Sequence, residues 1–242
     1  MENRFSRTEM LIGKGGLKIL VSSRVAVFGL GGVGSYAVEA LARAGIGGFT
    51  LVDFDIITVS NINRQLHALE DTLGMAKVDL MRDRIKKINP RAEITAYKER
   101  YAGEQREKFF AEPPDYVVDA IDDLEGKVDL IKHCLSGGIP VVSSMGAGNK
   151  MDPTLFKVDD ISATSVCPLA RAVRRRLRQE GVTTGVKVVF STEEPCRPDG
   201  APEAGTKKFV PGSISFVPPV AGMILAGVVV RDLLKGTTPG QN

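Results

Sequence analysis

A glycine-rich turn between a short apolar run and a helical pattern constrains this chain more than any other feature. Residues 24–28 have the composition of a buried strand, and Gly29-Leu30-Gly31-Gly32-Val33-Gly34 follows them directly. A helical pattern then continues to about Ala44. Glycines in such a turn allow a phosphate to approach closely, and the amides that open the helix can bind it. The sequence therefore predicts a nucleotide site that includes Gly29, Gly31, Gly32 and Gly34.

Apolar runs alternate with helical patterns through the first two-thirds of the chain. Further strands are expected at residues 49–52, 94–97, 116–118 and 140–143, and helices at 76–88, 104–110 and 127–135. This alternation favours an α/β fold with a Rossmann-like, doubly wound, mostly parallel sheet. After Gly148 two strands, at 155–158 and 187–190, flank a helix at 169–179. We therefore expect one domain, residues 1–242, with a core at 1–150 and a smaller C-terminal α+β extension at 151–242.

Three further features limit the class of protein. The longest apolar run, near residues 216–230, contains two prolines and predicts a buried helix instead of a membrane span. Residues 193–212 are rich in Pro, Gly and charge, which predicts a mobile loop. The three cysteines form no C-x-x-C pair, which favours free thiols and argues against a zinc site. A cytoplasmic protein without a membrane partner is expected.

The glycine turn alone does not distinguish ATP from NAD. Asp53 follows the second strand, where an acidic side chain about 20 residues beyond the turn can accept ribose hydroxyls. Arg64 and Lys77 add positive charge, which a triphosphate needs because charge accumulates on the leaving pyrophosphate. Either cation alone would more often be a solvated surface residue. ATP is favoured, and an NAD-dependent oxidoreductase is the alternative.

Carboxylates follow the expected strand at 116–118, in Asp119-Ala120-Ile121-Asp122-Asp123. Ligands of open α/β sheets bind outside the carboxyl ends of strands. A carboxylate there can hold Mg²⁺ against phosphate oxygens. Asp122 is the preferred Mg²⁺ ligand, although Asp122 and Asp123 could instead cap the following helix.

A specific set of short motifs occupies about the first 150 residues. It comprises Arg4-Phe5-Ser6-Arg7, the glycine turn, Asp53-Phe54-Asp55, Ser60-Asn61-Ile62-Asn63-Arg64-Gln65, Lys77 and Asp119-Ala120-Ile121-Asp122. The set resembles the ubiquitin-activating-type superfamily, which includes the ThiF-type thiamine and molybdopterin adenylyltransferases. The resemblance implies ATP-dependent adenylation of a carboxylate.

The same resemblance implies residue roles. Asp53 would hold the ribose, Lys77 the phosphates, and Asp122 the metal. The other nucleotide-binding residues would be Asp55, Asn61, Asn63, Arg64 and Gln65. An N-terminal arginine, best matched by Arg7 with Arg4 as second candidate, would reach the ATP site of a neighbouring subunit, which implies a homodimer. Arg7, Arg64, Lys77 and Asp122 form the expected catalytic set.

A closer resemblance covers nearly the whole chain. Asn63 to Leu69, Met145-Gly146-Ala147-Gly148, Asp152-Pro153-Thr154 and Val189-Phe190-Ser191-Thr192-Glu193 are similar to motifs of the tRNA threonylcarbamoyladenosine dehydratase branch. That branch activates the carboxylate of a threonylcarbamoyl group beside the anticodon, and ring closure then completes a dehydration. The missing zinc cysteines favour this branch over enzymes that activate a small sulfur-carrier protein, which are the alternative. A sulfur-transfer partner and a monovalent cation are compatible with the resemblance, and residues 151–242 would bind substrate and form the dimer.

A basic helix is the candidate tRNA surface. Arg171, Arg174, Arg175 and Arg178 are spaced to share one helix face, beside an apolar stripe of Leu169, Val173 and Leu177. Clustered arginines can follow RNA phosphates. The alternative is a solvated helix whose arginines form ion pairs with neighbouring carboxylates.

Overall fold

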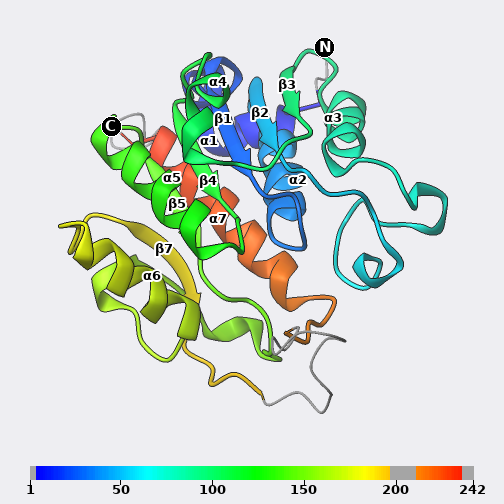
Figure 1. Ribbon diagram of the computed structural model, residues 1–242. Helices are drawn as coiled ribbons and strands as arrows, with labels where there is room; N and C mark the ends of the chain where they lie inside the picture. The colour runs from blue at the N-terminus through cyan, green and yellow to red at the C-terminus, as the bar shows by residue number, and fades with distance from the viewer. Residues whose placement is uncertain (1–3, 197–210, 236–242) are drawn as a thin grey trace.

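The computed structural model describes residues 4–196 and 211–235, which surround one seven-stranded sheet (Figure 1). The strand order is β3-β2-β1-β4-β5-β7-β6, and every neighbouring pair is parallel except β6 and β7. The strands are β1 (Arg24–Phe28), β2 (Gly48–Val52), β3 (Glu93–Tyr97), β4 (Tyr116–Asp119), β5 (Val141–Ser144), β6 (Phe156–Asp160) and β7 (Lys187–Ser191). The predicted mostly parallel α/β fold is confirmed.

Helices cover both faces of this sheet. The α-helices are α1 (Ser6–Ser22), α2 (Gly34–Ala44), α3 (Lys77–Ile88), α4 (Arg106–Phe109), α5 (Leu124–Ser136), α6 (Pro168–Gln179) and α7 (Val217–Leu233). Short 3₁₀ helices lie at η1 (Val59–Asn61), η2 (Glu70–Thr72), η3 (Gly103–Gln105), η4 (Pro153–Leu155) and η5 (Ile161–Ala163). The helices and strands expected after residue 24 all form, with bounds that shift by a few residues.

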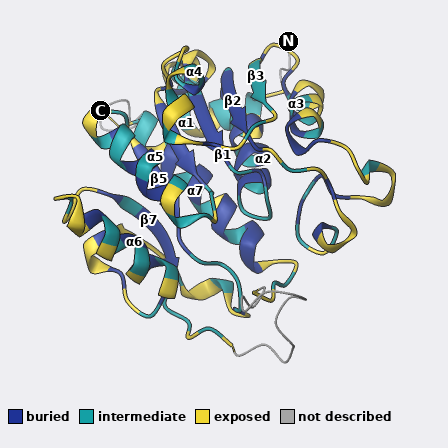
Figure 2. Cartoon of the chain, viewed as in Figure 1, coloured by how far each residue is buried: buried dark blue, intermediate teal, exposed yellow. Residues whose placement is uncertain are grey.

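Successive residues of β1 enter two different cores. Val25 and Val27 pack in a core with α2, α3 and α7, whereas Ala26 and Phe28 pack in a core with residues of α4 and α5. Side chains of a strand alternate between its faces, so a strand covered on both sides must be apolar throughout. The dark-blue central strands in Figure 2 are buried for this reason.

The C-terminal part continues the same sheet. β7 pairs in parallel with β5, and β6 pairs antiparallel with β7. The apolar run after residue 216 forms α7, which packs against α2 and is largely buried, as expected. None of the helices within the described ranges combines the length and apolar character that a membrane crossing requires. Within the expected extension, β6 and β7 therefore widen the sheet at one edge, whereas α7 packs into the main core.

Two segments differ from, or fall outside, the sequence expectations. No element was expected before β1, in a segment where Gly13, Gly15 and Gly16 lower helix propensity. The structure forms α1 there, with a break at Gly13 (φ 73°) and with Gly16 and Leu20 buried. Residues 193–196 and 211–212 form no helix or strand, and the rest of the expected loop lies outside the described residues.

The strand order reverses between β1 and β4. From β1 the chain builds outward through β2 and β3, and it then returns to add β4 and β5 on the other side of β1. The turns that leave β1 and β4 therefore diverge to opposite faces, and a crevice opens between them. The glycine turn follows β1 and the Asp122 segment follows β4, so both predicted motifs lie at this switch point.

Candidate nucleotide site

Most of the predicted nucleotide-binding residues meet around one cavity of about 530 Å³. It lies at the carboxyl ends of β1, β2 and β4. The predicted residues in its wall are Gly29, Gly31, Gly32, Asp53, Asp55, Asn61, Arg64, Gln65, Lys77 and Asp122. A larger cavity of about 730 Å³ lies at the amino ends of β1, β2 and β3 and contains none of them. The smaller cavity is therefore the candidate nucleotide site.

The glycines of the turn serve two different purposes. Gly29 has φ +85°, and a Cβ on it would lie 2.6 Å from the Ala120 carbonyl oxygen. A Cβ on Gly34 would lie 1.8 Å from the Gly29 carbonyl oxygen, so Gly34 closes the turn and does not line the cavity. At Gly31 the nearest atom to a Cβ would be the Gln65 side-chain nitrogen, at 3.9 Å. Gly31 therefore leaves open space where a phosphate can approach the start of α2.

Asp53 connects the end of β2 to the glycine turn. Its Oδ2 accepts the Leu30 amide at 2.6 Å, and its Oδ1 accepts the Asp55 amide at 2.8 Å. Burial raises the pKa of Asp53, against the opposing effects of Lys77 and of these two amides. Each carboxylate oxygen has a second lone pair, which can accept a ribose hydroxyl.

Lys77 lies in the cavity wall as a buried cation with one carboxylate partner. It is the first residue of α3 and only 4% exposed, and its Nζ is 2.6 Å from Asp55 Oδ2. The Asp55 side chain is 45% exposed, so it can move into solvent more easily than Lys77 can. Phosphate oxygens entering the cavity would compete with Asp55 for this ammonium group.

Asn63 lies outside the cavity wall and holds Arg64 instead. Arg64 Nη1 donates to the Ser60 carbonyl and to Asn63 Oδ1, both at 2.8 Å. Asn63 Nδ2 in turn donates to the Ser213 carbonyl at 2.9 Å. Both ends of the Asn63 amide bind protein groups in this structure, and its direct contact with a nucleotide stays a prediction.

Gln65 presents an unused acceptor at the cavity. The residue is 6% exposed, and its Oε1 has no hydrogen-bond partner within the described part of the chain. A buried acceptor without a partner costs free energy, so a ligand that donates to it gains. The amino or hydroxyl groups of an adenosine are suitable donors. Asn61 also lines the cavity, and its Oδ1 accepts the Thr58 amide at 3.2 Å.

Asp123, and not Asp122, caps the helix that follows β4. Asp123 Oδ2 accepts the Gly126 amide at 2.9 Å and caps α5, and its Oδ1 is 3.6 Å from Arg100. Asp122 is exposed in the cavity wall. Across residues 4–196 and 211–235, no group of three or more His, Cys, Asp or Glu side chains could hold a metal. One carboxylate fits Mg²⁺ that arrives with phosphate oxygens and water as its other ligands.

The candidate N-terminal arginines do not reach the cavity of their own chain. Arg7 is exposed on α1 and is not part of the cavity wall. Arg4 Nη1 donates to the Ile88 carbonyl at 2.7 Å, beside the cavity at the amino ends of the strands. The predicted role of Arg7 at the ATP site of a neighbouring subunit stays a prediction.

The basic helix α6 has an apolar and an arginine face. Ala170, Val173 and Leu177 are buried, and Arg171, Arg174, Arg175 and Arg178 line one shallow cavity of about 390 Å³. Among the described residues none of these four forms an ion pair, whereas Arg176 pairs with Glu125 at 3.0 Å. Arg174 is the least available, because its Nη1 donates to the Thr164 carbonyl at 2.6 Å.

The cavity wall includes residues to which the sequence analysis gave no role. Arg100 lies with its guanidinium carbon 5.4 Å from the Phe54 ring centre. Both line the cavity together with Tyr101, Ala147 and residues 211–213. Nothing local in the sequence separates Phe54 or Arg100 from a surface residue. The Met145 to Gly148 motif was the available signal for the segment after β5.

Several known proteins are similar to this chain over much of its length. The profile of the ThiF family matches residues 5–241. The tRNA threonylcarbamoyladenosine dehydratase of Bacillus subtilis (strain 168) is 51% identical over 244 residues, which cover 97% of this chain and 96% of that protein. The crystal structure of the Escherichia coli tRNA N6-threonylcarbamoyladenosine dehydratase in complex with ATP matches with a TM-score of 0.87 at 36% identity, covering 96% of this chain and 93% of that chain. The molybdopterin-synthase adenylyltransferase of Escherichia coli (strain K12) is 34% identical over 145 residues, covering 60% of this chain and 58% of that protein.

Proposed function

The chain belongs to the ThiF family, and we propose that it is an ATP-dependent tRNA threonylcarbamoyladenosine dehydratase. The observation that carries the proposal is the meeting of Arg64, Lys77 and Asp122 with the glycine turn at one cavity. The 51% identity to a dehydratase extends over almost the full length of both proteins. This identity favours the tRNA substrate over a sulfur-carrier protein. The molybdopterin-synthase adenylyltransferase, a relative of the alternative type, matches only 60% of the chain. The ATP complex of the Escherichia coli relative supports ATP over NAD as the nucleotide.

The cavity can promote adenylation of the threonyl carboxylate. A carboxylate oxygen attacks the α-phosphorus of ATP, and the bond to pyrophosphate breaks. Lys77 and Arg64 stabilise the charge that accumulates on the leaving pyrophosphate. Mg²⁺, held by Asp122, would neutralise further phosphate charge. Lys77, Arg64 and the metal would therefore supply positive charge where the reaction develops negative charge.

The second step needs no nucleophile from the protein. A nucleophilic atom of the carbamoyl substituent attacks the activated carbonyl carbon and gives up a proton to solvent, and AMP leaves with one carboxylate oxygen. The result is a cyclic base that has lost one water, and the positioned substrate supplies the proximity. Cys167 is only 2% exposed, which makes it unsuitable as an attacking thiolate in this step.

A homodimer would complete the site with Arg7 of the neighbouring chain. Arg7 lies on α1 close in sequence to Met10 and Leu11, which are 78% and 82% exposed. Large apolar side chains exposed together on one helix are characteristic of an interface. We assign them to the contact with a second copy, which carries Arg7 toward the partner's cavity.

The unpaired arginines of α6 are the proposed tRNA-binding surface. Arg171, Arg175 and Arg178 are exposed and can contact phosphates, while Arg174 mainly anchors the helix. A tRNA substrate also implies a cytoplasmic location. The relation to sulfur-carrier adenylyltransferases makes a sulfur-transfer protein a second class of partner. A monovalent cation stays a prediction, to which the structure assigns no residues.

Mass spectrometry of tRNA nucleosides tests this function. The enzyme with ATP and Mg²⁺ should convert threonylcarbamoyladenosine in tRNA into a nucleoside lighter by one water, and Arg64→Ala should prevent it. Pyrophosphate exchange with a sulfur-carrier protein but no change in tRNA would replace this proposal with the alternative one. Tight NAD binding without ATP binding would exclude both.

A further inference from the structure

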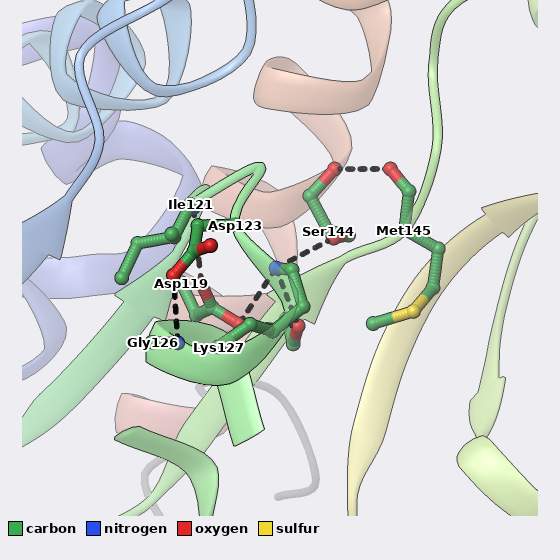
Figure 3. Close-up of polar contacts among 8 residues, drawn as sticks. Asp119, Ile121, Asp123, Gly126, Lys127, Ser144 and Met145 are labelled. Carbon is green, nitrogen blue, oxygen red and sulfur yellow. Dashed lines mark hydrogen bonds and ion pairs between the residues drawn. The ribbon is translucent and has the colours of Figure 1, made fainter. Parts of the chain in front are cut away.

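A fully buried ion pair lies behind the cavity wall, between β4, α5 and β5. Lys127 Nζ is 2.8 Å from Asp119 Oδ2, and both side chains are 0% exposed. Figure 3 shows Lys127 extending from α5 toward Asp119, at the end of β4, and toward the end of β5. Every other ion pair in the described part of the chain has at least one partner in contact with solvent. This pair is therefore exceptional in the molecule.

Every donor of the lysine has an acceptor. Besides Asp119, Lys127 Nζ donates to Ser143 Oγ at 3.2 Å and to the Ser144 carbonyl at 3.0 Å. Asp119 Oδ2 also accepts the Ser143 hydroxyl at 2.6 Å. An ammonium group has three donors, so the lysine is fully satisfied. Four groups from three elements thus form one closed network.

Stability alone does not account for this network. Removing two charges from water cancels much of the attraction between them, and apolar side chains of similar volume often stabilise a core as well. Because the pair is neutral as a whole, it also adds no net charge to the cavity. Its distinctive property is geometric, since a bonded network with fixed directions permits one arrangement of β4, α5 and β5.

The network holds both turns that border the cavity on this side. Asp119 Oδ1 accepts the Ile121 amide at 3.0 Å and so sets the path of the turn that carries Asp122. Lys127 holds the Ser144 carbonyl, and the chain then continues to Ala147 and Gly148 in the cavity wall. The two turns follow neighbouring parallel strands, and this network joins them where each turn leaves its strand.

We propose that Asp119 and Lys127 are positioning residues that fix the Asp122 turn relative to the turn after β5. This inference rests on the proposed role of Asp122 toward Mg²⁺ and ATP. Neither residue lines the cavity, so their effect passes through the Ile121 amide and the Ser144 carbonyl. Partners that hold a metal-binding carboxylate from behind commonly change metal affinity by about 10- to 100-fold when they are removed.

The test uses a charge-free pair in the full-length enzyme. Lys127→Met alone would strand a buried carboxylate, so the informative variant is the double substitution Asp119→Leu with Lys127→Met. Lys132→Met is the matched control, because Lys132 lies on the same helix and forms an exposed ion pair with Glu180 at 2.8 Å. Calorimetry measures ATP binding as a function of Mg²⁺ and AMP binding without metal. Hydrogen exchange measures the protection of the Ile121 amide.

In the double variant, the Mg²⁺ concentration for half-maximal ATP binding should rise by about 10-fold or more. Its AMP affinity should stay within about 2-fold of wild type. Its Ile121 amide should exchange faster, and Lys132→Met should match wild type in every measurement. An unchanged Mg²⁺ requirement would overturn the inference. So would an equal loss of ATP and AMP binding, because a purely structural pair would act on both ligands. If the wild type itself binds no ATP, the proposed function fails, and unchanged Ile121 protection in the double variant would separately refute the positioning role.

Discussion

Lys77 Nζ and Asp55 Oδ2 are 2.6 Å apart in the wall of the nucleotide cavity, and the lysine is the buried partner. The carboxylate holds the ammonium group in place when no phosphate is bound. Because water screens a buried cation poorly, its electrostatic attraction to phosphate oxygens is stronger than that of an exposed lysine. Under the proposed function, the pair keeps the ammonium group oriented for a triphosphate.

Replacing Lys77 by methionine should remove most of the adenylation activity. Loss of one preorganised donor to developing charge typically lowers kcat by about 10²- to 10³-fold. Pyrophosphate exchange measures the effect. Lys87→Met provides the control, since Lys87 is an exposed lysine on the same helix and should leave exchange unchanged. Equal activities of the two variants would remove Lys77 from the catalytic set.

Substitutions of Asn63 should affect turnover more than ATP binding. Asn63→Ala removes the acceptor for Arg64 and the donor to Ser213 together, and we expect kcat to fall by about 10-fold. Asn63→Asp keeps the acceptor and should retain more activity. Steady-state kinetics separates the alternatives, because direct contact between Asn63 and ATP would instead raise KM with kcat unchanged.

His67 should make the free energy of unfolding depend on pH in the mildly acidic range. It is 5% exposed with no partner for either ring nitrogen among the described residues, and burial, with smaller contributions from Lys77 and Arg84, lowers its pKa from 6.5 to about 4. The unfolded chain therefore binds a proton first as pH falls. Stability is fully present above about pH 6.5 and is lost toward pH 4, by about 3 kcal/mol.

The substitution His67→Leu tests this linkage by denaturant unfolding. The variant should lose that part of the pH dependence between pH 6.5 and 4. It should also be at least as stable as wild type at pH 7, because two unpaired nitrogens leave the interior. A pH profile with the same slope in both proteins would contradict the lowered pKa.

Reversing the charge of Arg175 should weaken tRNA binding. Arg175 is exposed and forms no ion pair within the described ranges, so Arg175→Glu removes a phosphate contact and adds repulsion. The slope of the logarithm of the binding constant against the logarithm of salt concentration should become shallower by about one, which corresponds to one lost phosphate contact. Arg176→Glu makes the same charge change on the same helix at a residue already paired with Glu125, and should have a smaller effect. Arg174 is unsuitable as a test because its replacement would also release Thr164.

Arg7 should act across the dimer. Arg7→Ala and Lys77→Met would each be inactive alone, yet mixed dimers would contain one intact site. Random exchange of subunits should restore roughly a quarter of wild-type activity, because each heterodimer combines one doubly altered site with one unaltered site. Dimers that exchange subunits without recovering activity would place Arg7 outside the partner's site.

Local patterns in the sequence determined the fold class and most of the nucleotide site. The strand at residues 24–28, the glycine turn and the helix that follows lie within one short window, where period and composition are sufficient. The same holds for the strand ends that carry Asp53 and Asp122. Carboxyl ends of parallel strands meet at one edge, so placing the strands also placed these carboxylates.

The tertiary structure alone decided which polar groups bind each other. Asn63 meets Ser213 across 150 residues, and Lys127 is buried only because β4 and β5 enclose it. The helix α1 forms although its glycines lower helix propensity, because Leu20 and its neighbours pack into the main core. Arg174 and Arg175 are adjacent in one run of arginines, yet only Arg174 donates a hydrogen bond to Thr164. Such partners leave no periodicity in the sequence, because a contact between distant segments depends on how the whole sheet and its helices pack.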